Sequence, residues 1–315
     1  MPQFIPISLA PLRGVTVHDF RAVFARRFGG VDYAVAPFIP TVAGTTVPPK
    51  LLKDIAPVDG LRTVPQLIGK DPAQLRVMAT ALRDLGFAEM NLNCGCPWKF
   101  VAKKGRGSGL PEDENNFARM LEAGCDAMPD GFSIKIRLGM KDNATLAKRA
   151  ALIASFPLKE IIIHPRTGTQ MYEGAVDLDA FADVLPTMRC PVVYNGDIKT
   201  LEDYRRITTR FPTLSGVMLG RGLIADPFLA SDIKSGEKTP CNPAAVSDFL
   251  NELYRIYRIT LCGPSPVLGR MKELWGITHE YFDEGARILR AVQRSNTLDE
   301  YEKVTNRGLP PRLHF

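Results

Sequence analysis

The chain has 315 residues, of which 45% are hydrophobic and 23% charged, and its formal net charge is +6. This length and composition can bury a large core in one or two domains and exclude an intrinsically disordered chain. No apolar run reaches the roughly 18 residues that a membrane-spanning helix needs, and the first 14 residues lack the basic segment of a signal peptide. Six cysteines are a poor disulfide framework for this length, so we expect a reduced, cytoplasmic protein.

Short runs of β-branched and apolar residues recur along the first 230 residues and alternate with segments of helical spacing. They predict eight strands, at 4–11, 33–38, 63–69, 89–95, 133–139, 160–166, 191–197 and 216–222. This alternation predicts parallel strands joined by crossover helices, and eight such units of this total length predict a TIM (β/α)8 barrel. A doubly wound sheet is the competing fold, but its Gly-rich turn after the first strand is missing, because residues 9–20 hold a single glycine.

The pattern changes near the C-terminus. Residues 235–243 ("SGEKTPCNP") are typical of a linker, and residues 244–305 show helical spacing with no strand pattern. We therefore expect a barrel domain over residues 1–238 and a small helical domain over residues 243–315.

Polar residues interrupt the apolar runs at the C-terminal ends of the predicted strands, where TIM barrels carry their active sites. They are Gln66, Asn93, Cys96, Lys135, Arg137, His164, Arg166, Asn195, Asp197, Gly220 and Arg221. A barrel built for stability alone does not need an amide, a thiol, a lysine, a histidine and arginines at one mouth. Together they predict a site.

Two of these strand ends are suited to a phosphate group. "YNGDI" (194–198) and "LGRG" (219–222) offer small glycines, backbone N–H groups and the Arg221 guanidinium. The loops after the seventh and eighth strands are the usual phosphate site in this fold. The alternative is that Gly196 and Gly220 only serve tight turns.

Lys135 interrupts an apolar strand, so its side chain needs an anionic or acceptor partner if it points into the barrel. The N1–C2=O edge of a reduced flavin would provide one, and Gln66 could bind the pyrimidine edge of the same ring. His164 could serve the ring or the substrate, since neutral imidazole both donates and accepts hydrogen bonds. A structural histidine is the alternative.

Cys94 and Cys96 lie one residue apart in "NCGCP". A disulfide between them would have poor geometry, and no neighbouring His or Cys completes a zinc site, so we expect no metal. Cys94 fits a buried strand residue. Cys96 follows Gly95 and precedes Pro97, on a stiff turn above the barrel mouth, where a protonated thiol could act as an acid.

A basic cluster follows directly in "WKFVAKKGRGSG" (98–109). Lys99, Lys103, Lys104 and Arg106 occur there without an acidic residue. Such a cluster can hold the phosphates of a cofactor or a nucleic acid, and a solvated loop is the alternative.

Seven motifs, in order, resemble those of the tRNA-dihydrouridine synthases, flavoenzymes that reduce the C5=C6 bond of uridine in tRNA. They are "APLRGVT", "PQLIG", "LNCGCPWK", "IKIRLG", "IHPRTGTQMYEG", "YNGDI" and "LGRG". The helical end, with "GRMKELWGITHEYF" (269–282), is similar to the family's RNA-binding domain. The resemblance covers nearly the whole chain.

The resemblance implies FMN as cofactor, NADPH (or NADH) as reductant and tRNA as substrate, without an obligate protein partner, so we expect a monomer. Cys96 is the implied general acid. The implied FMN residues are Pro11, Leu12, Arg13, Gln66, Lys135, His164, Asn195, Gly196, Asp197, Gly220 and Arg221. The implied substrate residues are Asn93, Arg137, Arg166 and Tyr194 at the uridine, with Arg270 and Lys272 at the tRNA.

The chain departs from the family pattern at several positions. Leu12 replaces the usual methionine, Val17 replaces a common aspartate, Ala36-Pro37 replaces a Thr-Glu pair, and "KGRGSGLP" replaces a longer stretch. The first and last changes lie near the flavin and the Cys96 loop, and the change at Ala36-Pro37 leaves open which uridine is reduced. Two other functions remain as alternatives: a flavin barrel that reduces a free pyrimidine or a small enone, and an RNA-binding barrel whose flavin site has decayed.

Overall fold

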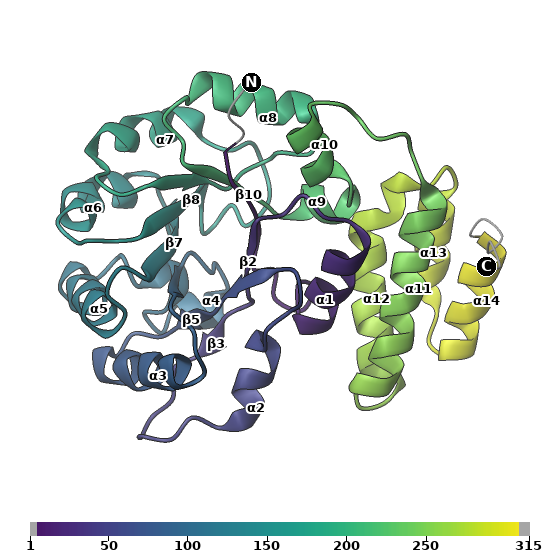
Figure 1. Ribbon diagram of the computed structural model, residues 1–315, viewed down its shortest axis with the longest axis horizontal. Coiled ribbons are helices and arrows are strands. Elements are labelled where there is room, and N and C mark those ends of the chain that lie inside the picture. The colour runs from purple at the N-terminus through teal and green to yellow at the C-terminus, as the bar shows by residue number, and fades with distance from the viewer. Residues whose placement is uncertain (1–4, 309–315) are drawn as a thin grey trace.

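The computed structural model describes residues 5–308, with side chains up to residue 305. It contains a barrel of parallel strands surrounded by helices and, beside it, a group of C-terminal helices (Figure 1). The strands are β1 (Ile7–Leu9), β2 (Tyr33–Val35), β3 (Ile39–Pro40), β4 (Arg62–Val64), β5 (Gln66–Ile68), β6 (Met90–Cys94), β7 (Phe132–Gly139), β8 (Glu160–Thr167), β9 (Val192–Tyr194) and β10 (Gly216–Leu219). Phe4 of the predicted first strand and residues 309–315 of the predicted helical domain lie outside the described residues.

These ten strands form one parallel sheet that closes on itself. β1 pairs with β10 on one side and with β2 on the other, while β2 pairs with β4 and β3 pairs with β5. Pro65 separates β4 from β5, because proline has no N–H for the ladder. Since β2 and β3 are consecutive, as are β4 and β5, the ten strands occupy eight positions around a barrel. The predicted TIM barrel is confirmed.

Helices surround the barrel and lie in the connections between its strands. They are α1 (His18–Arg27), α2 (Pro49–Leu52), α3 (Pro72–Asp84), α4 (Lys99–Ala102), α5 (Glu114–Ala127), α6 (Ala144–Ala154), α7 (Leu178–Val184), α8 (Leu201–Arg210), α9 (Arg221–Ala225) and α10 (Leu229–Ser235), with 3-10 turns at Lys53–Ile55, Gly107–Gly109 and Leu185–Thr187. A further 3-10 turn, His279–Tyr281, lies in the C-terminal part of the chain. Side chains at the N-terminal ends help to determine where these helices begin. The Asp71 carboxylate, for example, accepts hydrogen bonds from the Ala73 and Gln74 N–H groups at the start of α3.

The closed sheet separates two hydrophobic cores, one inside the barrel and one outside it. A small core fills the barrel and contains Ala10, Val35, Val64, Ile162 and Met218, among others. A large core lies between the sheet and the helices, and it takes the residues of alternate parity, such as Ile161 and Ile163 on β8. Because successive side chains of a strand point to opposite faces, this alternation decides which strand-end residues reach the barrel mouth.

The C-terminal helices are α11 (Pro243–Thr260), α12 (Pro264–Thr278), α13 (Gly285–Arg294) and α14 (Leu298–Gly308). They pack beside α1 (Figure 1), where the Phe249 ring contacts the edges of Phe20 and Phe24 at centroid distances of 5.4 and 6.3 Å. Glu252 also pairs with Arg26 and Arg27. No helix in the described range 5–308 is both long and apolar enough to cross a membrane.

Candidate active site

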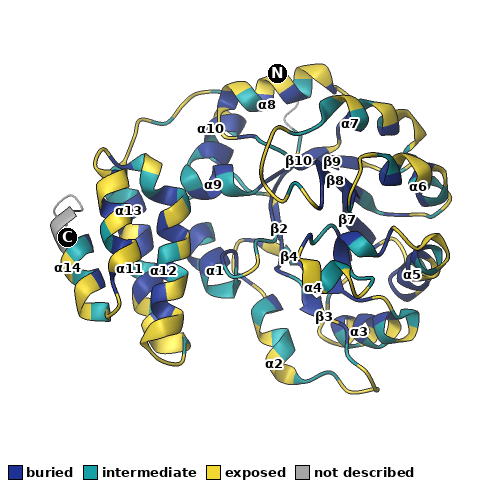
Figure 2. Cartoon of the chain, turned by 180° about the vertical axis from the view of Figure 1, so that it is seen from behind, coloured by how far each residue is buried: buried dark blue, intermediate teal, exposed yellow. Residues whose placement is uncertain are grey.

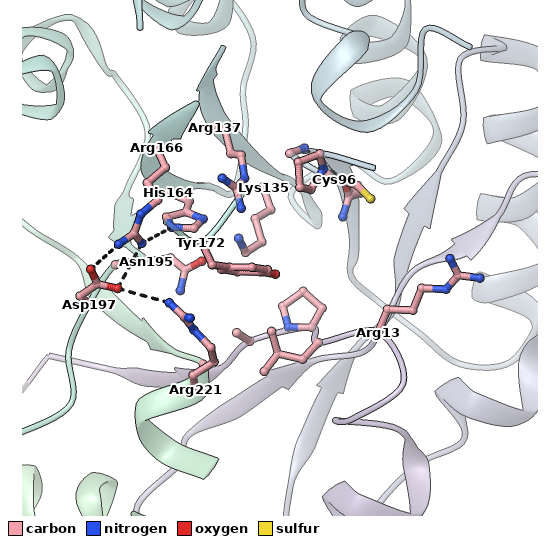
Figure 3. Close-up of a pocket in the computed structure, with 18 of the residues that line it drawn as sticks. Arg13, Cys96, Lys135, Arg137, His164, Arg166, Tyr172, Asn195, Asp197 and Arg221 are labelled. Atoms are coloured by element: carbon pink, nitrogen blue, oxygen red, sulfur yellow. Dashed lines mark hydrogen bonds and ion pairs between the residues drawn. The ribbon is translucent and has the colours of Figure 1, made fainter. Parts of the chain in front are cut away.

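A pocket opens at the C-terminal ends of the strands (Figure 3). Its space, including the part open to solvent, is about 1000 Å³. Most of the residues expected at the site line it: Pro11, Leu12, Arg13, Asn93, Cys96, Lys135, Arg137, His164, Arg166, Asn195, Gly196, Asp197, Gly220 and Arg221. The barrel therefore brings together side chains from both halves of the chain.

Strand register explains why these side chains meet. On β7 and β8, Lys135 lies opposite Ile162 and Arg137 lies opposite His164. Ile162 belongs to the core inside the barrel. Residues of the same parity on these strands therefore point inward, and those beyond the last apolar layer reach the pocket.

A ladder of buried amides lies beneath the pocket. The Asn93 Nδ2 donates to the Gln66 Oε1 at 2.9 Å, and the Gln66 Nε2 donates to the Asn91 Oδ1 at 2.8 Å. Gln66 is fully buried and is not part of the pocket lining, so it supports Asn93 rather than facing a ligand directly. The Asn93 Oδ1 in turn accepts from the backbone N–H groups of Gly95 and Cys96, at 3.2 and 2.8 Å.

These bonds hold the turn that carries Cys96. The Cys96 carbonyl also accepts from the Ser108 N–H at 3.1 Å and from the Ser108 hydroxyl at 2.9 Å. Burial raises the pKa of the Cys96 thiol, against the lowering effect of the Trp98 backbone N–H and of Arg13, Arg137 and Lys135. The side chain is therefore a protonated thiol at neutral pH.

The inner wall of the pocket is lined by basic side chains, of which Arg137 is charged while Lys135 and His164 hold their protons less firmly than usual. Burial, followed by repulsion from Arg137, lowers the pKa of Lys135 to about 7. Burial and the surrounding cations, Arg137 first, lower the pKa of His164 well below its ordinary value, so its imidazole is neutral. Within the described chain no carboxylate pairs with Lys135. A bound group with negative charge would supply the missing partner.

At the other end of the pocket, Asp197 connects two arginines. Its carboxylate accepts from Arg166 at 2.5 and 3.1 Å, and the Arg221 guanidinium lies 3.7 Å away (Figure 3). Asn195 is held by a bond from its Nδ2 to the Met218 carbonyl at 2.9 Å. Gly196 has no room for a side chain, because a Cβ there would collide with the Tyr194 hydroxyl. Glycine backbone and the guanidinium groups of Arg166 and Arg221 thus line the same end of the pocket, a composition suited to an anion.

Three aromatic residues that the sequence reasoning did not assign also line the pocket: Phe38, Trp98 and Tyr172. The Tyr172 ring lies between guanidinium groups, 4.7 Å from Arg221 and 5.5 Å from Arg137. The Arg13 guanidinium lies 5.6 Å from the Trp98 ring and 5.8 Å from the Phe38 ring. All three occur a few residues beyond the end of a strand, namely β2, β6 and β8. This position is the one feature of the sequence that could have indicated them.

One substrate prediction, for Tyr194, does not fit the observed position, while the tRNA contacts of Arg270 and Lys272 stay predictions. Tyr194 points outward, where its ring packs at 5.3 Å against Phe181 of α7, because Asn195 next to it faces the pocket. Arg270 and Lys272 on α12 are two residues apart and so lie on different sides of the helix. Arg270 donates to the Gly14 carbonyl of the first barrel loop. Among the described residues, no cluster of His, Cys, Asp or Glu side chains could hold a metal ion.

The family model of dihydrouridine synthases matches residues 8–260. A probable tRNA-dihydrouridine synthase of Rhodobacter capsulatus is 34% identical over 257 residues, which cover 79% of this chain and 78% of that protein. A tRNA-dihydrouridine(16) synthase of Cupriavidus necator is 28% identical over 321 residues, covering 96% and 97%.

Solved structures show the same fold at low identity. The variant of NCR from Zymomonas mobilis has a TM-score of 0.54 at 11% identity, covering 78% of this chain and 93% of that one. Morphinone reductase has a TM-score of 0.52 at 11% identity, covering 76% and 88%. These likenesses establish the barrel, whereas the match of the family model over residues 8–260 establishes more: the chain is a member of the dihydrouridine synthase family.

Proposed function

We propose that this protein reduces the C5=C6 bond of a uridine in tRNA, with FMN as cofactor and NADPH, or alternatively NADH, as the source of electrons. The observation that carries the proposal is the pocket itself, in which a protonated thiol, Cys96, faces the same space as the basic side chains of Lys135 and Arg137. A proton donor beside a site for an anionic ring is what such a reduction requires. The relatives named above carry tRNA-dihydrouridine synthase in their names.

The residues present fit FMN. Lys135 lacks an acidic partner in the described chain and would hold the N1–C2=O edge of the ring, with neutral His164 beside it. Asn195, Gly196, Asp197, Gly220 and Arg221 would hold the phosphate end, and Pro11, Leu12 and Arg13 would line the ring. When bound, the flavin supplies the hydride for C6 of the uracil.

The protein supplies orientation and the proton. Cys96 keeps its proton because burial raises its pKa, so it can protonate C5 at neutral pH. Asn93 holds the Cys96 turn through its Oδ1, while its own side chain is fixed by Gln66. Arg137, Arg166 and Tyr172 lie across the pocket, where an inserted base would meet donors and an aromatic face.

A base stacked within the RNA cannot lie flat on a flavin ring, so the uridine must leave the RNA stack. Extrusion costs a few kcal/mol. We further propose position 16 as the target, because relatives that match this chain over more than 90% of both lengths are named tRNA-dihydrouridine(16) synthases.

The test is to incubate purified enzyme, FMN and NADPH with unmodified tRNA and to map dihydrouridine at each position. We expect the product at position 16, and none in a transcript that carries cytidine there. Product at another uridine would support the proposed activity and contradict position 16 as the target. Reduction of free uracil or an enone, without any product in RNA, would instead favour the small-molecule reductase.

A further inference from the structure

Next to Cys96, the chain displays an exposed aromatic and basic segment that the proposed chemistry does not use. We name it the α4 rim, defined by Trp98, Lys99, Phe100, Lys103 and Lys104. Phe100 is 80% exposed and Trp98 is 54% exposed, so two large aromatic side chains only two residues apart face solvent. Figure 2 shows α4 as an exposed helix on the face of the barrel turned toward the viewer.

The α4 rim is firmly attached to the Cys96 turn. Ser108 anchors the Cys96 carbonyl by two hydrogen bonds, at 2.9 and 3.1 Å. Gly107 has a φ of +55°, and a Cβ there would lie 2.8 Å from the same carbonyl. A Cβ on Gly109 would collide with the Ala102 carbonyl at the end of α4. The backbone of the segment is therefore packed against the Cys96 turn, and α4, which carries Phe100, lies directly beside the pocket.

The charge of the rim is unbalanced. No aspartate or glutamate occurs between Glu89 and Glu112. Lys99, Lys103 and Lys104 are exposed, and in the described part of the chain none of them forms an ion pair. A polyanion is the complementary partner for such a surface.

We propose that the α4 rim binds a single-stranded stretch of the substrate RNA next to the extruded uridine. Phe100 stacks on a neighbouring base, and the three lysines contact phosphates. The proposal rests on the proposed function, because extrusion of one base leaves its neighbours without a stacking partner. An exposed ring beside unpaired lysines is the combination by which proteins bind single strands.

The first experiment compares Phe100→Ala, Phe100→Leu and Phe100→Tyr in the full-length protein. Affinity for unmodified tRNA at fixed salt, FMN content, and the rate of flavin reduction by NADPH without RNA are measured. We expect Phe100→Ala and Phe100→Leu to weaken tRNA binding about 5- to 100-fold and Phe100→Tyr to preserve it. FMN content and flavin reduction stay at the wild-type level. Leu85→Ala, which removes another exposed apolar side chain, is the control and leaves affinity unchanged.

The second experiment removes the charges. Lys103→Ala and Lys104→Ala should each weaken binding and lower the dependence of log affinity on log salt by about one unit or slightly less. Unchanged affinity in Phe100→Ala, or equal losses in Phe100→Leu and Phe100→Tyr, would overturn the stacking role, and an unchanged salt dependence would overturn the phosphate contacts. These outcomes are separate from the proposed function, whose failure appears as absence of dihydrouridine in the wild-type reaction.

Discussion

At the scale of single residues, Cys94 and Cys96 illustrate how two side chains one residue apart acquire different surroundings. Cys94 ends β6 and lies in the core between the sheet and the helices, 1% exposed. Gly95 then turns the chain, and Cys96 reaches the pocket. Burial raises the pKa of both thiols, so neither is a thiolate at neutral pH. Position, and not ionisation, separates their roles.

Cys96→Ala is expected to slow uridine reduction by about 10²- to 10⁴-fold, because it removes the proposed proton donor and leaves the rest of the pocket intact. Reduction of the flavin by NADPH should be unaffected. Single-turnover oxidation of pre-reduced enzyme by unmodified tRNA measures the affected step alone. In the wild type this step should not vary with pH around neutrality. It should slow only at alkaline pH, above the ordinary thiol pKa of about 8.5, because the raised pKa keeps the acid form present.

The matched control for that experiment is Cys94→Ala. It truncates a small buried side chain and should cost about 1 kcal/mol of unfolding free energy with little change in rate. If Cys94→Ala abolished turnover and Cys96→Ala did not, the two assignments would be reversed. If neither variant lost rate, the proton would come from another group or from water.

Lys135→Met is expected to weaken FMN binding and to stabilise the flavin-free protein. Loss of a charge-assisted bond should weaken FMN affinity about 10- to 100-fold. In the flavin-free fold the pKa of Lys135 is about 7, below its ordinary 10.5, so between these values the unfolded chain holds a proton that the folded chain lacks. The free energy of unfolding of the wild type therefore falls as pH falls from 10.5 to 7, whereas that of the variant has no such contribution.

Thermal unfolding of flavin-free wild type and Lys135→Met, measured from pH 7 to pH 10, checks the second half of that prediction. The stability advantage of the variant should be largest near pH 7 and should shrink as pH rises. An unchanged affinity for FMN in the variant would contradict the role of Lys135 at the ring.

At the scale of elements, the loop between β8 and α7 owes its shape to two buried arginines. The Arg137 Nη1 donates to the carbonyls of Thr167 and Met171, at 2.8 and 2.7 Å, and Arg166 donates to the Gly174 carbonyl. Met171 adopts a φ of +52°, which few side chains tolerate without such support. The loop in turn places Tyr172 over the pocket.

Arg137→Met is expected to loosen this loop. Two carbonyls lose their donor, at a cost of about 1–3 kcal/mol, so backbone amides in residues 168–174 should exchange with solvent about tenfold faster or more. Hydrogen exchange read by mass spectrometry measures this, with peptides of α3 as the internal reference. Unchanged exchange in residues 168–174 would show that Arg166 alone holds the loop.

At the scale of the whole molecule, the barrel and the C-terminal helices share one continuous core. Phe20 and Phe24 of α1 belong to the same hydrophobic cluster as Phe249, Leu253 and Trp275. Removal of the residues after 242 would expose this aromatic surface of α1. RNA binding by the helical part is therefore better tested by point variants than by truncation.

Phe249→Ala is expected to lower the unfolding free energy of the whole chain by about 3–5 kcal/mol. The chain has two tryptophans, Trp98 at the barrel mouth and Trp275 in α12. In a Trp98→Phe background, Trp275 fluorescence reports the helical part and flavin release reports the barrel. Both signals should share one denaturant midpoint and move together on Phe249→Ala. Two separate midpoints would show that the parts unfold independently.

The amino-acid sequence by itself was enough to predict the barrel, the start of the C-terminal helices and most of the residues that line the pocket. These features depend on patterns that are local. Runs of β-branched residues make strands, helical spacing makes crossovers, and polar residues at strand ends share one mouth because all the strands are parallel. Side-chain parity is equally local: because successive side chains of a strand point to opposite faces, Tyr194 lies on the side opposite Asn195.

Tertiary structure alone decided the remaining features. Gln66 lies beneath Asn93 because side chains of neighbouring strands fill the barrel in layers. Tyr172 lines the pocket because Arg137 of β7 and Arg166 of β8 together hold its loop. The pKa of Lys135 falls to about 7 because distant segments converge to exclude water and bring Arg137 near. Burial and electrostatic interaction depend on distance in space, and the linear order of residues does not specify that distance until the barrel has closed.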